Sequence, residues 1–374
     1  MKITAAVLHQ SPVAAPYAQT QPLRIEELEL APPQVGEVLV EVKAAGLCHS
    51  DLSVINGDRP RPVPMALGHE AAGIVREIGP NVSRFKPGDH VVMVFVPSCG
   101  HCIPCAEGRP ALCEPGNAAN GRGELIGGGR RLSLKAEPVQ HHVGVSAFAT
   151  HAVLSENSLV KIDDSVPFEI AALFGCAVLT GVGAVINSGA VRPGQSVAVV
   201  GLGGVGLSAL LGAVAAGAHP IVAVDLSPEK LAFAKELGAT HCFDARDEGL
   251  AAAVKQATDG GVHVAIELAG SVRALETAFA ITRRGGLTVT AGLANPAHNF
   301  AFPPVRLVGE ELTLRGSYVG SCVPVRDIPR FITLYKSGDL PVNKLLTSRS
   351  DLNGINAALD QLAQGKTVRH VITF

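Results

Sequence analysis

The sequence predicts an α/β protein in which a doubly wound parallel sheet is joined to a second, mostly β domain. After about Cys176, short apolar strands alternate with Ala-rich helical segments, which is typical of a parallel sheet. Before it, β-branched runs are separated by Pro and Gly, as in an irregular β domain. The 374 residues exceed one ordinary core, so two domains are expected.

The first half supplies the mostly β domain. Strand-like runs occupy residues 38–42, 73–78 and 90–96, and the N-terminal segment MKITAAVLHQ is expected to form the first strand. That segment lacks the long apolar core and cleavage site of a signal peptide, which favours a cytoplasmic location.

The second half supplies the parallel sheet and then a different ending. Its predicted strands are residues 197–200, 221–224, 262–266 and 287–291. Helices at 329–337 and 353–364 and a last strand at 368–374 follow, and this tail is expected to return to the first domain.

Composition disfavours two classes of partner. A formal charge of −2 and 4% aromatic residues without Trp argue against nucleic-acid binding. Residues 196–218 carry no charge and could span a bilayer, but they contain six glycines directly after a β-branched run. A strand, a phosphate loop and a buried helix explain this segment better, so no membrane partner is expected.

The four cysteines of residues 97–115 predict a structural metal lobe. They lie close enough in sequence to bind one tetrahedral ion: Cys99, Cys102, Cys105 and Cys113. Four thiolates leave no open position for a substrate, so a zinc ion there would stabilise the fold. An iron–sulfur cluster is the alternative, but it would need a redox partner that nothing else in the sequence suggests.

A glycine-rich loop after the predicted strand 197–200 indicates dinucleotide binding. The loop comprises Gly201, Leu202, Gly203, Gly204, Val205 and Gly206, and an apolar helix follows it. Asp225 directly follows the next predicted strand, at a position where a carboxylate accepts ribose hydroxyls and repels a 2′-phosphate. Neither Leu226 nor Ser227 supplies an arginine, so NAD is favoured over NADP; a loop that serves only packing is the alternative.

A third group is diffuse: Cys48-His49-Ser50-Asp51, then Gly68-His69-Glu70, then Gly175-Cys176. From the residues alone, Cys48, His69 and Cys176 are either a metal site or ordinary buried side chains. Their order, with the cysteine lobe, Thr180-Gly181, the glycine loop and Asp225, resembles the zinc-dependent medium-chain alcohol dehydrogenases nearly end to end. The length and layout resemble the liver-type branch.

The resemblance implies a Rossmann NAD-binding domain at residues 178–320, inserted into a GroES-like catalytic domain built from residues 1–177 and 321–374. It implies two zinc ions, one structural in the cysteine lobe and one catalytic, held by Cys48, His69 and Cys176. The catalytic zinc would keep one position open for water or the substrate oxygen and acidify the alcohol, whose hydride passes to the nicotinamide.

The resemblance also implies roles for neighbouring side chains. Ser50 matches the hydroxyl that accepts the alcohol proton, Asp51 a carboxylate that orients His69, and Glu70 a carboxylate near the metal. Phe95 and His142 match substrate-pocket positions. Further cofactor contacts are expected from Lys230, His49, Thr180 and Arg369.

Two positions depart from the liver-type pattern. Ser53 stands where those members commonly carry a histidine that relays the proton to solvent, so the end of the relay differs here. His49 stands where they often have an arginine against the pyrophosphate, which predicts a weaker and pH-sensitive contact.

The expected function is NAD-dependent interconversion of primary, allylic or aromatic alcohols and aldehydes by a homodimer or homotetramer. Polyol dehydrogenases are disfavoured, because that branch usually has Glu where this chain has Cys176. Three alternatives stay open: a glutathione-dependent formaldehyde dehydrogenase, a nicotinoprotein alcohol dehydrogenase that keeps its cofactor bound, and a non-catalytic NAD-binding protein.

Overall fold

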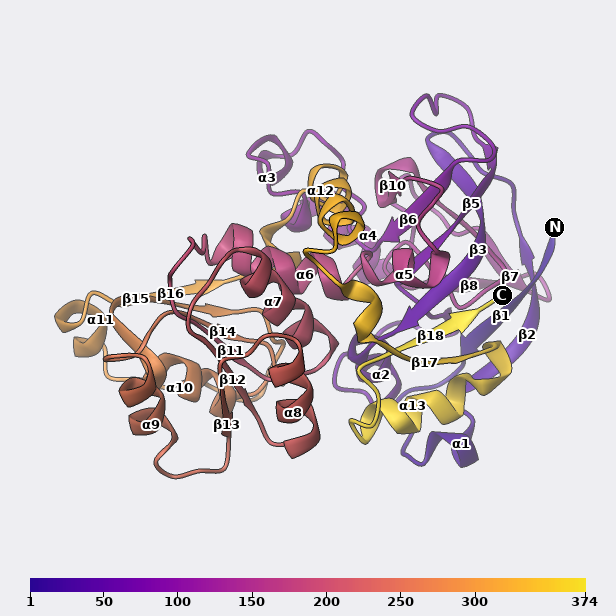
Figure 1. Ribbon diagram of the computed structural model, residues 1–374. Coiled ribbons are helices and arrows are strands. Elements are labelled where there is room, and N and C mark those ends of the chain that lie inside the picture. The colour runs from indigo at the N-terminus through magenta and orange to yellow at the C-terminus, as the bar shows by residue number, and fades with distance from the viewer. The chain divides into compact units, whose positions relative to one another are not determined.

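A computed structural model describes residues 1–374, which divide into two units (Figure 1). Unit 1 combines Met1–Cys176, Val323–Pro329 and Asn343–Phe374, and unit 2 combines Ala177–Cys322 and Arg330–Val342. The predicted fold class is confirmed: unit 2 contains a parallel sheet flanked by helices, and unit 1 is mostly β.

Unit 1 contains a closed barrel of five short strands in the order β1-β2-β7-β8-β4. These are β1 (Lys2–Leu8), β2 (Leu23–Leu30), β4 (Met65–Ala66), β7 (Leu132–Leu134) and β8 (Glu137–His141). Alternate residues of the strands point inward, so Ile3, Val7 and Leu28 pack together with Val139 in one apolar cluster.

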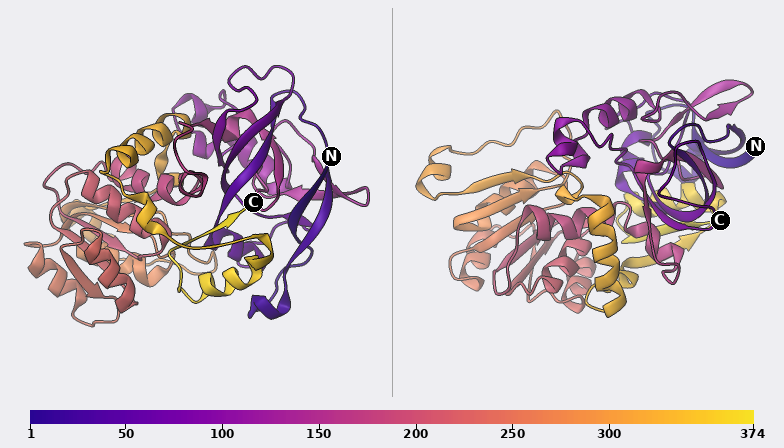
Figure 2. Two further views of the ribbon diagram at one scale, coloured as in Figure 1. Left: turned by 45° about the vertical axis from the view of Figure 1, so that its right-hand side comes forward. Right: turned by 90° about the horizontal axis from the view of Figure 1, so that it is seen from above.

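A second sheet of unit 1 has seven strands. Its order is β10-β6-β5-β3-β18-β17, and β9 pairs with β3 off this path. The strands are β3 (Glu37–Leu47), β5 (Glu70–Ile78), β6 (His90–Val94), β9 (His151–Ser155), β10 (Leu159–Lys161), β17 (Leu346–Ser350) and β18 (Arg369–Thr373). The C-terminal strand β18 runs antiparallel to β3, which brings the last residues of the chain beside the first half (Figure 2).

Six helices accompany these sheets: α1 (Tyr17–Thr20), α2 (His49–Ile55), α3 (Ile103–Ala106), α4 (Glu114–Arg122), α5 (Phe168–Leu173) and α13 (Ile355–Ala363). In α13, Ile355, Leu359 and Leu362 recur at helical spacing and are buried in the main core of the unit. Leu52 of α2 joins the same core, which fixes the helix that follows Cys48.

Unit 2 contains a six-stranded parallel sheet in the order β13-β12-β11-β14-β15-β16. Its strands are β11 (Val197–Val200), β12 (Ile221–Asp225), β13 (His241–Asp244), β14 (Val262–Glu267), β15 (Thr282–Thr290) and β16 (Thr313–Gly316). The strand order reverses between β11 and β14, which is where doubly wound sheets bind their ligands.

Helices cover both faces of this sheet (Figure 1). They are α6 (Ala177–Gly183), α7 (Gly204–Ala215), α8 (Pro228–Glu236), α9 (Leu250–Ala257) and α10 (Val272–Ile281), with α11 (Val305–Gly309) near one edge. Leu250 and Val254 of α9 and Ile281 of α10 pack on the apolar residues of one face. The helices α7 and α8 lie on the opposite side (Figure 1).

Several element boundaries differ from the sequence prediction; β3, for example, extends to Leu47 and β5 begins at Glu70. The helix expected from Pro329 begins at Pro324, a residue that suits the first position of a helix, and runs to Ser337 as α12 with Pro329 inside it. The strand expected from residue 287 is β15, which begins at Thr282. Its first part is irregular, because Arg283 to Gly286 bulge out of the pairing with β14.

The uncharged stretch 196–218 forms β11, the glycine loop and α7, as expected. None of the helices combines the length and the apolar character that crossing a membrane would require.

Candidate functional site

Three segments of unit 1 bring Cys48, His69 and Cys176 together. Cys48 lies between the end of β3 and the start of α2, His69 directly precedes β5, and Cys176 follows α5. All three side chains are buried, and their ligand atoms lie within 4.8 Å of one another. Two thiols and an imidazole at this separation form a donor set suited to zinc, with a fourth position left over.

The carboxylate of Asp51 fixes the orientation of the His69 ring. Asp51 Oδ1 lies 3.0 Å from His69 Nδ1, and Asp51 Oδ2 accepts the backbone N–H of Cys48 at 3.1 Å. The other ring nitrogen, Nε2, is buried and has no hydrogen-bond partner. A buried orphan nitrogen beside two thiols is the group that a zinc ion would satisfy, so the residues present fit the metal.

The charges around this group favour a bound cation. Burial opposes protonation of His69, but the Asp51 carboxylate and the Cys48 thiolate outweigh it and raise its pKa to about 10. A hydrogen bond with Cys176, together with His69 and Arg369, holds the pKa of Cys48 well below its ordinary value despite burial. The negative charge that raises the first pKa would also attract a dication.

His142 approaches the same carboxylate from the segment after β8. Its Nδ1 lies 3.4 Å from Asp51 Oδ1. Its ring packs edge-on against the ring of His69, with 5.6 Å between the ring centroids. Burial lowers the pKa of His142 despite Asp51, so this ring is neutral. The sequence did not indicate this contact, because no spacing rule relates Asp51 to so distant a residue.

Phe95 and the serines of α2 complete the surroundings. The Phe95 ring packs edge-on against the His69 ring, with 5.3 Å between the ring centroids. Both predicted substrate-pocket residues, Phe95 and His142, therefore pack against the same imidazole. Ser50 is half-buried in the first turn of α2. Ser53 Oγ donates to the carbonyl of His49 at 2.7 Å, one turn back on the same helix.

Glu70 forms a buried ion pair with Arg369 of β18. Both side chains are almost fully excluded from solvent, and a Cβ at Gly46 would meet Glu70 Oε1 at 2.5 Å, so a larger residue there would displace this carboxylate. The family resemblance implies separate tasks for the two residues, one beside the metal and one on the cofactor. Their pairing joins the two ends of the chain next to Cys48.

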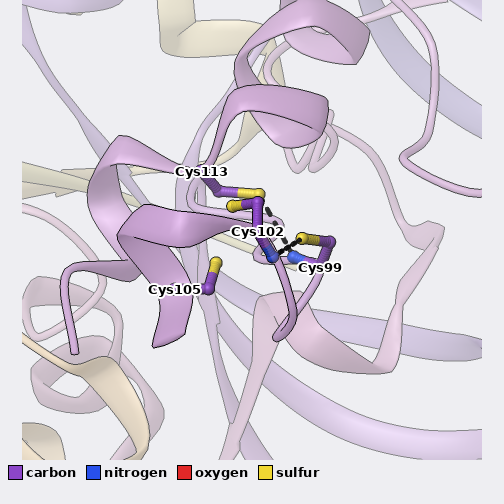
Figure 3. A group of neighbouring side chains, drawn as sticks. All are labelled: Cys99, Cys102, Cys105 and Cys113. Atoms are coloured by element: carbon purple, nitrogen blue, oxygen red, sulfur yellow. Dashed lines mark hydrogen bonds between the residues drawn. The ribbon is translucent and has the colours of Figure 1, made fainter. Parts of the chain in front are cut away.

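The four lobe cysteines converge in one place (Figure 3). Their sulfur atoms all lie within 4.8 Å of one another. Backbone N–H groups point at two of the sulfurs: that of Cys102 donates to Cys99 Sγ at 3.3 Å, and that of Cys99 donates to Cys113 Sγ at 3.2 Å. His101 is exposed and lies outside the cluster.

The thiols of this lobe cannot all ionise without a cation. Backbone N–H groups, that of His101 first, lower the pKa of Cys99 to about 6. Burial and the neighbouring sulfurs raise the pKa of Cys105 to about 12, because a thiolate there would be repelled by the others. A zinc ion removes this conflict, so the donor set fits a closed site with four sulfur ligands.

The glycine loop of unit 2 joins β11 to α7. Gly201 has φ +94°, and a Cβ at Gly206 would lie 1.8 Å from the carbonyl oxygen of Gly201, so both positions require glycine. A Cβ at Gly203 would meet nothing within 4 Å, which leaves the outer side of the loop open. The N–H groups of the first turn of α7, at Gly204, Val205 and Gly206, have no acceptor within the helix and can bind a pyrophosphate.

Asp225, at the end of β12, is tied to this loop. Its Oδ2 accepts the N–H of Leu202 at 2.6 Å and its Oδ1 accepts that of Ser227 at 3.0 Å. Each oxygen keeps a lone pair for a ribose hydroxyl. Lys230 lies in the first turn of α8 and Thr180 in α6, both in unit 2, whereas exposed His49 and buried Arg369 belong to unit 1.

Two family models match most of the chain. Residues 34–164 match the alcohol dehydrogenase GroES-like domain, and residues 204–337 match the zinc-binding dehydrogenase domain. An alcohol dehydrogenase D from Mycobacterium tuberculosis, whose name is provisional, is 40% identical over 376 aligned residues and is covered in full, as is this chain.

Solved structures of alcohol dehydrogenases are also similar to this chain over its full length. An alcohol dehydrogenase zinc-binding domain protein from Burkholderia ambifaria is 37% identical with a TM-score of 0.94, and the match covers 100% of this chain and 99% of that one. Benzyl alcohol dehydrogenase from Acinetobacter calcoaceticus is 36% identical with a TM-score of 0.93 at the same coverage. Full-length similarity in sequence and fold, with both cysteine groups assembled, makes the chain a member of the zinc-dependent medium-chain alcohol dehydrogenase family.

Proposed function

We propose that this protein is an NAD-dependent alcohol dehydrogenase with two zinc ions per chain that interconverts primary, allylic or aromatic alcohols and their aldehydes. The observation that carries the proposal is the buried group of Cys48, His69 and Cys176 with its orphaned imidazole nitrogen. We assign residues 1–177 and 321–374 to catalysis and residues 178–320 to cofactor binding.

The chain's own residues would prepare the substrate and remove its proton. Cys48, His69 and Cys176 would hold a zinc ion that supplies Lewis acidity toward an alcohol oxygen, and a bound nicotinamide would supply the hydride acceptor. Ser50 Oγ accepts the alcohol proton, while Asp51 holds the imidazole of His69 in one tautomer. Phe95 and the neutral ring of His142 line an apolar side of the site and offer no cation to a carboxylate substrate.

Separate features support each of the finer assignments. Asp225 disfavours a 2′-phosphate at the ribose, which supports NAD. Benzyl alcohol dehydrogenase, 36% identical to this chain, together with Phe95 beside His69, supports aromatic alcohols as substrates.

Six of the eight cysteines are assigned to metals and none forms a disulfide, which fits a reducing cytoplasm. A homodimer or homotetramer is expected, and sedimentation would establish it.

A substrate panel with metal counting tests the proposal. Purified enzyme is assayed with benzyl, allylic and simple primary alcohols, each with NAD and with NADP, and zinc is measured in the same preparation. We expect aromatic or allylic alcohol turnover with NAD and about two zinc ions per chain. Activity confined to hydroxymethylglutathione would indicate the formaldehyde branch, and turnover only with an external acceptor would indicate a nicotinoprotein. Zinc and NAD binding without any turnover would indicate a non-catalytic protein.

A further inference from the structure

Unit 2 contains a cavity of about 390 Å³ at the edge of its sheet where the strands begin. Gln195 precedes β11, His263 lies at the start of β14, and the bulged residues 283–286 come from the start of β15. The glycine loop follows the other end of β11. Because these strands are parallel, the cavity and the glycine loop occupy opposite edges of the sheet.

Three arginines line this cavity: Arg192, Arg283 and Arg284. None of them forms an ion pair with a carboxylate. Arg283 Nη1 lies 2.9 Å from His263 Nε2, and Arg284 Nη2 donates to the carbonyl of Gly309 at 3.0 Å. The hydrogen-bonding partners of the two guanidinium groups are uncharged, and a neighbouring carboxylate, that of Glu310, feels the charge of Arg284 without forming an ion pair with it.

The His263 ring is held between Ser196 and Arg283, which contact its two nitrogens. The backbone N–H of Ser196 donates to Nδ1 at 3.1 Å, Ser196 Oγ lies 2.7 Å from the same nitrogen, and Arg283 faces Nε2. Burial, and then the charge of Arg283, lower the pKa of His263, so the ring is neutral. The neighbouring carboxylate of Glu310 is already occupied, because Arg306 binds both of its oxygens at 2.9 and 3.0 Å.

The backbone is shaped to present these side chains. Pairing between β14 and β15 passes from Val262 with Thr282 to Val264 with Leu287, so residues 283–286 project from the sheet. Gly285 has φ +70°, which the turn of this bulge requires. Two consecutive arginines on a projecting bulge, beside Arg192, form a recess with three cationic side chains and no paired anion.

We propose that this recess, the arginine cavity, binds the phosphate group of a small phosphorylated compound. Guanidinium groups bind phosphate oxygens through paired N–H donors, and three of them match a dianion or trianion better than a monocarboxylate. The volume falls in the range of about 300–1,000 Å³ typical of small-molecule sites. The inference stands apart from the proposed function, because it uses none of the residues assigned to zinc, NAD or alcohol.

Isothermal titration calorimetry of the enzyme with inorganic phosphate and with pyrophosphate tests the proposal. The holoenzyme is titrated with and without saturating NAD, because the glycine loop can also bind pyrophosphate. We expect saturable binding that NAD does not displace and that Arg283→Gln and Arg284→Gln each weaken about tenfold or more. Arg24→Gln, at an exposed arginine of β2 in unit 1, is the matched charge control and should leave binding unchanged.

The outcomes separate the proposal from its alternatives. No binding beyond the part that NAD displaces, equal binding by wild type and both arginine variants, or tighter binding of citrate than of pyrophosphate would each overturn it. Circular dichroism and alcohol turnover check that the variants are folded. Arg192→Gln is the second variant if Arg283→Gln does not fold, since Arg192 lies in the loop before β11 and is exposed.

Discussion

The carboxylate of Asp51 lies 3.0 Å from Nδ1 of His69 and leaves Nε2 of that ring buried without a partner. The same carboxylate accepts the N–H of Cys48, so one side chain positions two of the three proposed zinc ligands. This arrangement orders the site before any ion binds, which lowers the entropic cost of binding the metal.

The first prediction concerns this carboxylate. Asp51→Asn keeps the shape of the side chain but removes its charge, so zinc affinity at the catalytic site should fall about 10- to 100-fold. Competition with a chelator, followed by metal analysis, measures the change. Asp89→Asn is the matched control, because Asp89 is also buried in unit 1 but pairs with Lys161 at 2.7 Å, away from the site. Equal zinc loss from both variants would contradict a specific role for Asp51.

The second prediction separates the two metal sites. Cys102→Ser should destabilise the lobe, because it removes one of four ligands from a segment whose helix α3 buries no residue. Any soluble fraction should still bind alcohol at the other site. Cys48→Ser should do the reverse and abolish turnover with little loss of stability. Thermal unfolding and metal content measure both effects, and equal loss of folding from the two substitutions would rule out this division.

The third prediction concerns the choice of nicotinamide cofactor. Leu226→Arg places a cation beside Asp225, at a position whose side chain is exposed. The variant should reduce the preference for NAD over NADP more than tenfold, about 1.4 kcal/mol. Asp225→Ala should weaken NAD binding further, because the N–H of Leu202 also loses its acceptor. The ratio of kcat/KM values with NAD and NADP measures the preference. A wild-type enzyme that prefers NADP would refute the assignment of Asp225.

The fourth prediction is a pH dependence of stability. Burial, helped by the charges of Arg131 and Arg130, lowers the pKa of His141 to about 3, whereas an unfolded histidine has a pKa of about 6.5. Between these values the unfolded chain binds one more proton. The free energy of unfolding should therefore fall by about 1.4 kcal/mol per pH unit as the pH drops below about 6.5.

Comparison of His141→Asn with wild type isolates this contribution. The variant lacks the titrating ring, so its loss of stability between pH 7 and pH 5 should be shallower, as measured by denaturant unfolding. His298→Asn, at an exposed histidine, should follow the wild-type curve. A variant with an unchanged pH slope would show that His141 takes up its proton in the folded protein as well.

Local patterns in the sequence were enough to predict several parts of the structure. The strand, glycine loop, helix and strand from β11 to β12 follow from short-range periodicity and glycine spacing, and the predicted bounds of β11 are confirmed. The four lobe cysteines lie in one short segment, so their convergence could also be predicted from spacing.

Long-range pairings could not be predicted in this way. Glu70 and Arg369 come from opposite ends of the chain, and His142, which follows β8 of the barrel, contacts Asp51 of α2. Neither contact follows from a repeating pattern in the sequence. Cys48, His69 and Cys176 were separable from ordinary buried residues only through the family resemblance, because three ligands from three distant segments obey no spacing rule.

The last prediction concerns the exit of the proton from Ser50. Ser53 stands one turn further along α2, and its hydroxyl donates to the carbonyl of His49. A serine does not titrate near neutral pH, so Ser53 cannot relay a proton as the histidine of liver-type members would. On the proposed function, the proton would pass from Ser50 to a cofactor ribose hydroxyl and then to water or to His49.

Ser53→His tests whether this exit limits turnover. If it does, the added imidazole should raise the rate of alcohol oxidation most on the acid side of the pH profile, with little effect on aldehyde binding. Ser53→Asn is the matched control, because it adds a polar side chain without a titratable group. If cofactor release limits the rate instead, both variants will show the wild-type pH profile of kcat, and proton exit through this position will not be a limiting step.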